Sequence, residues 1–325
     1  MKMYRTPLPD EFLSRMGLLV DKDALESIIE AFSSGRPTTL RVNTLKSSEE
    51  ALEQCFKLHS IEYYRVDWNP IAFVIPKTPL RTLTELPEYT EGLFYVQSLS
   101  SMIPALVLDP KPGDRVLDIT AAPGSKTTQM AGLMKNEGEI VANDVSHTRR
   151  YRLEANLKAQ GVTNATVTKF VGQSLWKEYP EYFDKTLVDV PCSMEGRFDI
   201  NDPTSYEDWS TKKIKVLVEK QRWILRSAVS ATKPGGTIVY STCTLAPEEN
   251  EGVIDWILKK EKGSVTVEAC TIEKLPSATG LLEWKSRPYH SSLVGALRIW
   301  PTREMEGFFV VKLRKISSNV PGSNL

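Results

Sequence analysis

Residues 114–134 read DRVLDITAAPGSKTTQMAGLM, an apolar run that passes through a turn of small residues into a helical stretch. Three similar apolar runs follow, GEIVAND, KTLVDV and GTIVYST, each ending in polar residues and separated by long helical segments. Short buried strands that alternate with helices are typical of a doubly wound, mainly parallel sheet. We therefore expect an α/β fold with its ligand site at the carboxyl ends of these strands.

The residues before this pattern do not show the same alternation of buried strands and helices. We expect helix over residues 1–34 with Gly35 as its stop, a strand at 38–45, a helix at 49–60 and two further strands at 61–68 and 71–76. Ser47 and Glu50 have the spacing of a capping box for the second helix. The predicted organisation is an N-terminal α+β domain (1–90) that positions RNA, a catalytic domain (91–316) and a flexible tail (317–325).

Composition excludes several classes of protein. The 325 residues carry 41 Lys and Arg against 41 Asp and Glu, with 41% hydrophobic residues, so neither a disordered chain nor a polybasic tail fits. The four cysteines form no CxxC pair, which argues against a zinc knuckle, and we expect no metal. The start MKMYRTPLPDEF is not a signal peptide, and no run approaches the ~18 apolar residues of a membrane span. These features predict a soluble, cytoplasmic protein without a membrane partner.

The turn ITAAPGSKTTQ, residues 119–129, has several interpretations. A dinucleotide site requires GxGxxG, which is absent, and Gly124-Ser125-Lys126-Thr127 lacks the leading Gly and the GK pair of a Walker loop. A plain strand–helix turn remains open. A turn of small residues also lets backbone N–H groups approach a nucleoside ligand, and S-adenosylmethionine is the leading ligand of this kind.

Asp144 follows the second strand, 26 residues after Asp118. An acidic residue at this place accepts hydrogen bonds from both ribose hydroxyls of a nucleoside. It can equally cap the helix that begins at His147, and the two roles are compatible. His147 itself is interpreted as a surface residue in the first turn of that helix.

Two cysteines end the fourth and fifth strands. Cys192 follows Asp189, and Cys243 follows GTIVYST, so both thiols should lie on one rim of one cleft. Carbon 5 of cytosine attacks a methyl sulfonium only after a thiolate has added to carbon 6. Asp189 and Lys126 are placed to support the ring, and the charge of Lys126 would favour the thiolate. Cys55 and Cys270 lack such surroundings and are assigned no function.

Several motifs resemble the Sun/Fmu-type RNA (cytosine-5) methyltransferases, most closely the RsmF-like branch, which acts on 16S rRNA. They are LRVNTLK, GLFYVQSLSSMIPALVL, AAPGSKTTQ, VDVPCSMEGRF, KPGGTIVYSTCTLAPEENE and LRIWPTREMEGFF. The pairing of a PCS cysteine with a TCT cysteine followed by PEENE is the most specific of them. The resemblance implies a Rossmann-like methyltransferase fold with a seven-stranded sheet, and S-adenosylmethionine as cofactor.

The resemblance also implies a role for individual residues. Cys243 would be the nucleophile, Cys192 would help to release the product, and Asp189 would lie between cofactor and base. Asp144 would bind the ribose of S-adenosylmethionine, and Arg149 would lie near this cofactor. The methionine part of the cofactor would be surrounded by Ala121, Ala122, Pro123, Gly124, Ser125 and Lys126.

Three departures from the family pattern matter. Val171 stands where the family has an adenine-contacting Asp, so Gln173 would have to supply the acceptor. Met194 replaces a Gly after PCS and would narrow the base pocket. RsmF-type proteins often carry a further C-terminal extension for which 325 residues leave no room, so the RNA target, rRNA or tRNA, stays open.

Two other functions also remain open. A catalytically silent RNA-binding or ribosome-assembly factor on the same fold would explain Val171 and Met194. A DNA cytosine-5 methyltransferase would use Cys192 as its nucleophile, although the extra thiol of Cys243 argues against it. An RNA partner would be bound by local basic runs, and we expect a monomer. The basic runs and their aromatic neighbours are Arg149, Arg150 and Arg152; Lys212, Lys213, Lys215 and Lys220; and Tyr63, Tyr64, Arg65 and Trp68.

Overall fold

The central sheet of the computed structural model, which describes residues 6–320, has nine strands in the order β11-β14-β15-β9-β8-β5-β6-β7, with β10 paired to β15. Five strands are parallel: β5 (Arg115–Asp118), β6 (Glu139–Asn143), β7 (Ala165–Thr168), β8 (Phe183–Asp189) and β9 (Thr232–Thr242). All of them except β7 carry one of the four apolar runs that the sequence singled out. β15 (Phe308–Lys315) runs antiparallel to β9. The expectation of a doubly wound, mainly parallel sheet is confirmed.

The sheet has two strands more than the expected seven. The additional strands are short and lie on the antiparallel side: β10 (Val265–Glu268) pairs with the end of β15, and β11 (Ala278–Thr279) pairs with β14 (Leu297–Ile299). A separate hairpin is formed by β12 (Glu283–Trp284) and β13 (Arg287–Pro288). These strands have two to four residues, which is too short for an apolar period to reveal them.

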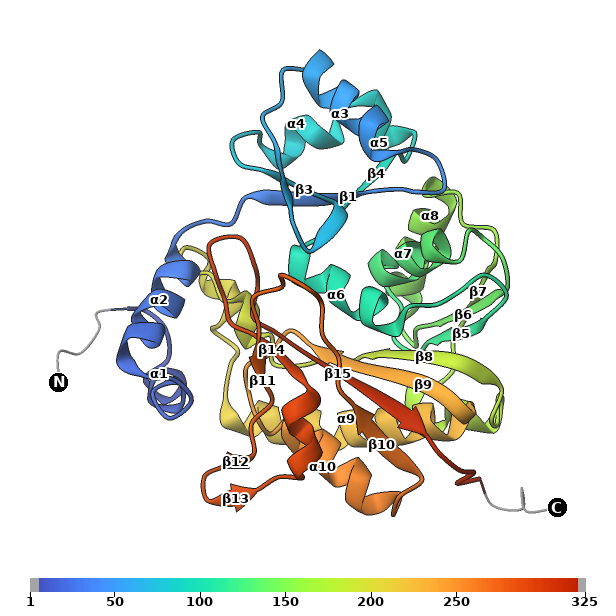
Figure 1. The fold of residues 1–325 in the computed structure, drawn as a ribbon. Coiled ribbons are helices and arrows are strands. Elements are labelled where there is room, and N and C mark those ends of the chain that lie inside the picture. Colours follow the sequence, from blue (N-terminus) through green and yellow to red (C-terminus); the bar gives the residue numbers. More distant parts are fainter. Residues whose placement is uncertain (1–5, 321–325) are drawn as a thin grey trace.

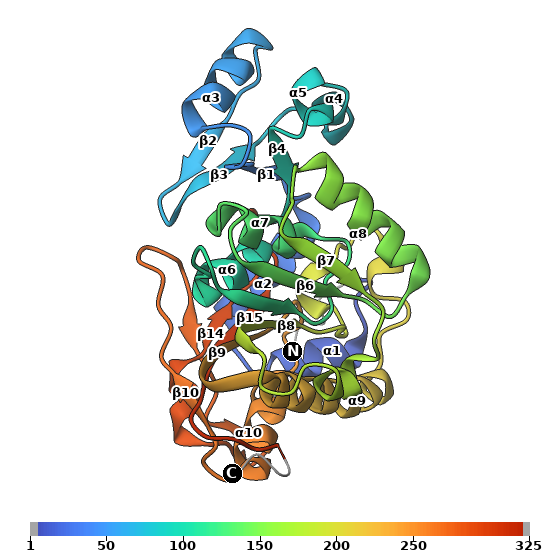
Figure 2. The same cartoon turned by 90° about the vertical axis from the view of Figure 1, so that its right-hand side faces the viewer.

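Helices cover both faces of the sheet (Figure 2). One face packs against α6 (Leu99–Leu108) and α7 (Ser125–Leu133), where Met102 and Met130 meet Leu187 and Val239. The other face packs against α9 (Thr211–Ala231) and α10 (Glu251–Lys260). α8 (His147–Ala159) buries Leu153 beside Ala121 on the side of α7. Both faces are therefore buried, as a parallel sheet requires.

A smaller four-stranded sheet, in the order β2-β3-β1-β4, lies above the central sheet in Figure 1. Its strands are β1 (Thr38–Val42), β2 (Tyr64–Val66), β3 (Asn69–Ile75) and β4 (Phe94–Val96), and its helices are α3 (Glu49–Leu58), α4 (Leu80–Thr84) and α5 (Pro87–Thr90). The sheet continues past the proposed boundary at residue 90, because β4 pairs with β1. The cap of α3 is Ser48, which accepts from the N–H of Ala51, and not Ser47 as expected.

The N-terminal segment forms two helices and not one, α1 (Asp10–Met16) and α2 (Lys22–Ser33). The break at residues 17–20 is followed by Asp21, whose side chain accepts from the N–H of Ala24 and starts α2. Phe12 of α1 packs on Phe198 with ring centroids 4.9 Å apart, so α1 braces the loop after β8. The helix expected from residue 1 is absent at residues 6–9, which are not helical, and residues 1–5 lie outside the described part of the chain.

The remaining short elements are four 3₁₀ turns, η1 (Gly172–Lys177), η2 (Glu195–Arg197), η3 (Pro203–Ser205) and η4 (Ser291–Gly295). Of the expected tail, the described residues contact the core: Asn319 donates to Ser230 at 3.1 Å and to Glu261 at 2.8 Å. Among residues 6–320, no helix is both long and apolar enough to cross a membrane.

Candidate active site

A cavity of about 800 Å³ opens at the carboxyl ends of β5, β8 and β9, where it is roofed by residues of the four-stranded sheet. Its wall collects residues that the sequence placed at separate strand ends. These are Ala121, Ala122, Pro123, Ser125, Lys126, Arg149, Asp189, Cys192 and Cys243. The carboxyl edge of the parallel strands is thus the site edge, as the doubly wound pattern predicted.

The AAPGSK turn bends sharply from β5 into α7. Gly124 has φ +106°, and a Cβ at this position would lie 2.9 Å from Leu153 Cδ1, so only glycine fits. The N–H of Gly124 returns to the carbonyl of Ala121 at 2.8 Å. The first turn of α7 begins at Ser125 on the cavity wall, so a helix N-terminus faces the cavity, a place that favours an anionic group.

Lys126 and Asp189 form an ion pair on the cavity wall. Lys126 Nζ lies 2.7 Å from Asp189 Oδ2 and donates to Ser101 Oγ at 2.8 Å. The other oxygen, Asp189 Oδ1, accepts from Ser241 Oγ at 2.7 Å. Lys126 is buried, whereas the Asp189 side chain is 28% exposed, so the carboxylate presents its open side to a ligand.

The thiols of Cys192 and Cys243 lie side by side, with their sulfur atoms 3.3 Å apart. The expectation that both thiols share one rim is confirmed by this distance. It follows from the pairing of β8 with β9, which aligns Asp189 with Ser241. No disulfide joins them, and both remain partly accessible. The cavity therefore contains two free thiols next to a lysine–aspartate pair.

The electrostatics distinguish the two thiols. The hydrogen bond with Cys243, together with burial, raises the pKa of Cys192 well above its ordinary value. A raised pKa favours the protonated form of Cys192, whose thiol lies within hydrogen-bond distance of the Cys243 sulfur. Arg197 supplies the cation: Glu306 raises its pKa most, and the nearby sulfurs of Cys243 and Cys192 add to the effect. Arg197 thus places a positive charge near both sulfurs. The sequence analysis expected Lys126 to be the cation beside the thiols, but Lys126 is instead bonded to Asp189 and Ser101.

The PEEN stretch after the TCT cysteine fixes the two cysteine loops against each other. Glu249 is fully buried and accepts from the N–H of Ser193 at 3.0 Å and from Gln221 Nε2 at 2.7 Å. Burial raises the pKa of Glu249 to about 7. Asn250 bonds Thr242 Oγ1 at 2.6 Å and donates to the carbonyl of Thr244 at 3.0 Å. The loop that carries Cys243 is therefore bonded on both sides of the sulfur.

The outer members of the same motif anchor it to the rest of the fold. Glu248 binds Arg15 of α1 at 2.7 Å, and Glu251 binds Arg298 of β14 through both of its oxygens, at 2.7 and 2.8 Å. Arg298 also donates to the carbonyl of Leu245 at 3.1 Å. Each acidic residue of the PEENE motif thus has its own structural partner, and none of them faces the cavity wall.

Asp144 satisfies one physical test for a nucleoside ligand. Its Oδ1 accepts from the N–H of Ser146 at 2.9 Å, whereas its Oδ2 is buried and has no hydrogen-bond partner. The guanidinium of Arg149 lies 3.4 Å from Oδ2 and is itself on the cavity wall. A buried acceptor without a donor suits a ribose hydroxyl. Asp144 itself does not line the cavity, whereas its ion-pair partner Arg149 does.

Two other positions lie differently from what the sequence indicated. Gln173, in η1, is not on the cavity wall, and neither is Val171, which is 52% exposed. The role of Gln173 as the adenine acceptor stays a prediction. Met194 does line the cavity, with φ +58°, a left-handed conformation that a glycine adopts without strain.

The sequence analysis missed three contributors to the site. Arg197 lies near the thiols, Glu306 accepts from Arg197 Nε at 3.1 Å and from Ser98 at 3.0 Å, and Arg41 is buried beneath the AAPGSK turn. Arg41 donates to the carbonyl of Ser125 at 3.1 Å, and burial lowers its pKa to about 10. Arg197 and Glu306 belong to the quoted motifs VDVPCSMEGRF and LRIWPTREMEGFF, which was the available signal.

The expected RNA-binding runs are only partly at the site. Arg149 and Lys213 line the cavity, whereas Arg65 is paired with Glu49 and Glu53 on the surface. Tyr63 and Trp68 pack against hydrophobic clusters, so they are part of the core and rim of the small domain.

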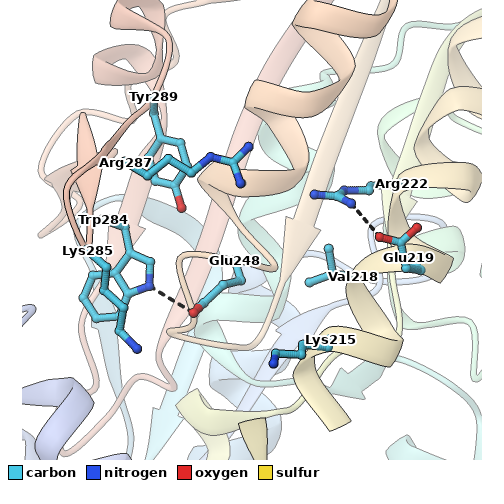
Figure 3. A pocket seen from close by; sticks show the side chains of 10 residues that line it. Lys215, Val218, Glu219, Arg222, Glu248, Trp284, Lys285, Arg287 and Tyr289 are labelled. Carbon is cyan, nitrogen blue, oxygen red and sulfur yellow. Dashed lines mark hydrogen bonds and ion pairs between the residues drawn. The ribbon is translucent and has the colours of Figure 1, made fainter. Parts of the chain in front are cut away.

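A second hollow of about 380 Å³ lies between α9 and the β12–β13 hairpin (Figure 3). In it Trp284 Nε1 donates to Glu248 at 3.0 Å, and Arg222 pairs with Glu219 at 2.6 Å. It contains neither thiol and no residue of the AAPGSK turn. We therefore assign the candidate active site to the larger cavity.

Comparison with known families gives two adjoining matches. Residues 105–314 match the family described as 16S rRNA methyltransferase RsmB/F, and residues 8–99 match the N-terminal domain of 16S rRNA methyltransferase RsmF. The second match ends close to β4, the last strand of the four-stranded sheet.

Among curated proteins, the chain is 40% identical over 322 residues to ribosomal RNA small subunit methyltransferase F of Vibrio cholerae serotype O1, covering 96% of this chain and 64% of that protein. To the same-named protein of Shewanella amazonensis it is 38% identical over 283 residues, covering 86% of this chain and 58% of the relative. The chain thus spans about three fifths of the length of these curated relatives.

Solved structures of methyltransferases are also similar to this chain. A methyltransferase homolog protein from Pyrococcus horikoshii is 33% identical with a TM-score of 0.78, and the match covers 95% of this chain and all of that one. NSun6 from Pyrococcus horikoshii, solved with SFG, is 26% identical with a TM-score of 0.82, and the match covers 97% of this chain and all of that one. The central sheet and its helices therefore form a Rossmann-like methyltransferase fold.

Proposed function

Since the chain belongs to the 16S rRNA methyltransferase RsmB/F family, we propose that it transfers a methyl group from S-adenosylmethionine to carbon 5 of a cytosine in RNA. Ribosomal RNA of the small subunit is the proposed substrate, because the curated relatives carry that name. One observation carries the proposal: two free thiols 3.3 Å apart share a cavity with the AAPGSK turn.

The cofactor proposal rests on the chemistry of the donors. The unpartnered Oδ2 of Asp144 would accept from a ribose hydroxyl, and the turn from Ala121 to Lys126 would hold the methionine part beside the N-terminus of α7. NSun6 was solved with SFG, an analogue of S-adenosylmethionine. Bound there, the cofactor would supply an electrophilic methyl group. For the ribose to reach Asp144, the Arg149 side chain would have to move aside.

The proposed chemistry begins at Cys243. Its thiolate adds to carbon 6 of the cytosine, which makes carbon 5 nucleophilic enough to take the methyl group. Lys126 donates to N3 and Asp189 accepts from the exocyclic amino group, and the two side chains so stabilise the charge that develops on the ring. Solvent water then takes the carbon 5 proton, and the electron pair of that bond re-forms the C5–C6 double bond and expels the Cys243 thiolate, which restores the aromatic ring.

Cys192 has the complementary task in this proposal. While Cys243 attacks, Cys192 keeps its proton, because the adjacent sulfur and burial raise its pKa. It lies close enough to Cys243 to assist release of the product. Arg197 and Glu306 are positioning residues that hold the cation beside both sulfurs.

The test combines methyl transfer with mapping of the product. The purified chain is incubated with radiolabelled S-adenosylmethionine and small-subunit rRNA that lacks the modification, and the product is read by bisulfite sequencing. A new protected cytosine supports the proposal. Absence of cofactor binding by calorimetry at millimolar ligand would favour the silent RNA-binding factor, and activity on DNA alone would favour the DNA enzyme.

A further inference from the structure

Three metal-binding side chains meet outside the candidate active site, in the small α+β unit. Cys55, His59 and Glu88 each direct one ligand atom into the same space, and these atoms lie within 4.8 Å of one another. His59 Nε2 and Glu88 Oε1 are 3.1 Å apart. The sequence analysis assigned Cys55 no function and expected no metal.

The local fold explains why the three side chains converge. Cys55 and His59 are four residues apart at the end of α3, where the N–H of His59 bonds the carbonyl of Cys55 at 3.0 Å, so both side chains lie on one face of the helix. Glu88 comes from the first turn of α5, 29 residues further along the chain. Both helices cover the same face of the four-stranded sheet (Figure 1).

An unsatisfied atom points to a missing ligand. Glu88 Oε2 is buried and has no hydrogen-bond partner, although the other oxygen of the same carboxylate is bonded to His59. A buried carboxylate oxygen without a donor is costly unless a cation or a donor satisfies it. The His59 side chain is 31% exposed, which leaves a path from solvent to the cluster.

The same three residue types also make up a nucleophilic triad, but the environment of the thiol excludes that role. The Cys55 thiol is buried, and the carboxylate of Glu88 beside it is acidic. A nucleophilic cysteine needs a lowered pKa and a cationic neighbour. A metal ion, in contrast, replaces the thiol proton directly when it binds.

We propose that Cys55, His59 and Glu88 bind one zinc ion, with water as the fourth ligand. Thiolate, imidazole and carboxylate are the ligands that zinc accepts in tetrahedral sites, and hard cations such as Mg²⁺ do not choose a thiolate. The ion ties α3 to α5 and thereby closes the segment that contains β2, β3 and α4. This site is independent of the proposed methyl transfer.

The test uses the full chain with Cys192→Ser and Cys243→Ser, because those adjacent sulfurs would themselves bind zinc. The metal-free protein is titrated with ZnCl₂ by calorimetry and with CoCl₂ by absorption. We expect one zinc per chain, a thiolate-to-cobalt charge-transfer band, and a rise in the thermal midpoint with zinc, because the ion binds only the folded state.

Each of Cys55→Ser, His59→Ala and Glu88→Gln should weaken zinc binding by at least about tenfold, since losing a ligand costs no less than losing an outer-shell partner. Cys55→Ser should also remove the charge-transfer band. Cys270→Ser changes another buried cysteine and should leave both signals intact. His59→Ala changes an exposed side chain, so its loss of binding does not depend on a folding defect. Absence of zinc binding in the parent, or binding unaffected by these variants, would overturn the proposal.

Discussion

The sulfur atoms of Cys192 and Cys243 lie 3.3 Å apart, although 51 positions separate the two residues. Two thiols at this distance cannot be equivalent, because ionising one disfavours ionising the other. The hydrogen bond with Cys243 and burial raise the pKa of Cys192, which favours its protonated form. The division of labour between the two thiols can therefore be tested separately.

Cys243→Ser should abolish methyl transfer, because a serine hydroxyl next to the Cys192 thiol does not form the adduct. Cys192→Ser should retain formation of the bond to RNA but slow turnover. The measurement is steady-state transfer of labelled methyl groups to rRNA, alongside a single-turnover assay. If Cys192→Ser were inactive and Cys243→Ser fully active, the roles would be reversed, as in the DNA-type enzyme.

Cys192→Ala should trap the enzyme on its substrate. Without the second thiol the product is released slowly, so a covalent protein–RNA species accumulates when cofactor and RNA are both present. A denaturing gel resolves it as a band of reduced mobility that RNase removes. The double variant with Cys243→Ser is the control and should show no such band, and its absence in Cys192→Ala itself would contradict the two-thiol mechanism.

Lys126→Met should lower the rate of methyl transfer roughly 100-fold, because it removes a preorganised donor beside Asp189. The methionine keeps most of the side-chain volume, so the thermal midpoint should fall by only a few degrees, about 1–2 kcal/mol. Rate and midpoint are measured on the same preparation. An unchanged rate, or a rate loss that merely follows unfolding, would remove the proposed role of Lys126.

The sequence predicted which strand ends form the site, but it did not predict the long-range side-chain contacts that hold those strand ends in place. The apolar runs ending at Asp118, Asp189 and Thr242 predicted the site edge, because parallel strands of one sheet bring their carboxyl ends together. Arg41 reaches Ser125 across 84 positions, and Arg197 reaches Glu306 across 109. Such pairs leave no periodic trace in a sequence.

The predictions for individual caps, helix ends, short strands and Cys55 were wrong for reasons that can be found in the neighbouring sequence or structure. Adjacent serines at 47 and 48 both suit an N-cap, and the structure uses the second. The break after α1 passes through Gly17, Leu18, Leu19 and Val20, whose apolar residues resemble a continuing helix. The missed strands β10 and β11 have four residues and two. Cys55 looked isolated because its partner Glu88 lies on another helix.

Glu249 should make folding stability depend on pH. Burial raises its pKa from 4.5 to about 7, so the folded state binds a proton more tightly than the unfolded state. Its contribution to stability is therefore fully present below pH 4.5 and is lost as the pH rises to about 7, a change of roughly 3 kcal/mol.

Urea unfolding across this pH range measures the effect. The free energy of unfolding of the wild type should fall relative to that of Glu249→Gln as the pH rises. This fall should level off above pH 7. Glu268→Gln is the control, because Arg314 lowers the pKa of Glu268 below 4.5. The contribution of Glu268 is lost only as the pH falls below 4.5, so its difference from the wild type should stay constant between pH 4.5 and 7. A pH-independent difference for Glu249→Gln would show that Glu249 is ionised throughout.

The buried pair of Glu251 and Arg298 should be strongly coupled. Both side chains are at most 2% exposed, and Arg298 also holds the carbonyl of Leu245, two residues after Cys243. Removing one partner leaves an uncompensated charge in the core, so Arg298→Met and Glu251→Gln should each cost about 3–5 kcal/mol of unfolding free energy. The double variant should cost clearly less than the sum, since it buries no unpaired charge. Urea unfolding of the four proteins measures the coupling, and strictly additive costs would contradict it.

Because the loop of Cys243 loses an anchor, Arg298→Met should also slow methyl transfer at temperatures where it remains folded.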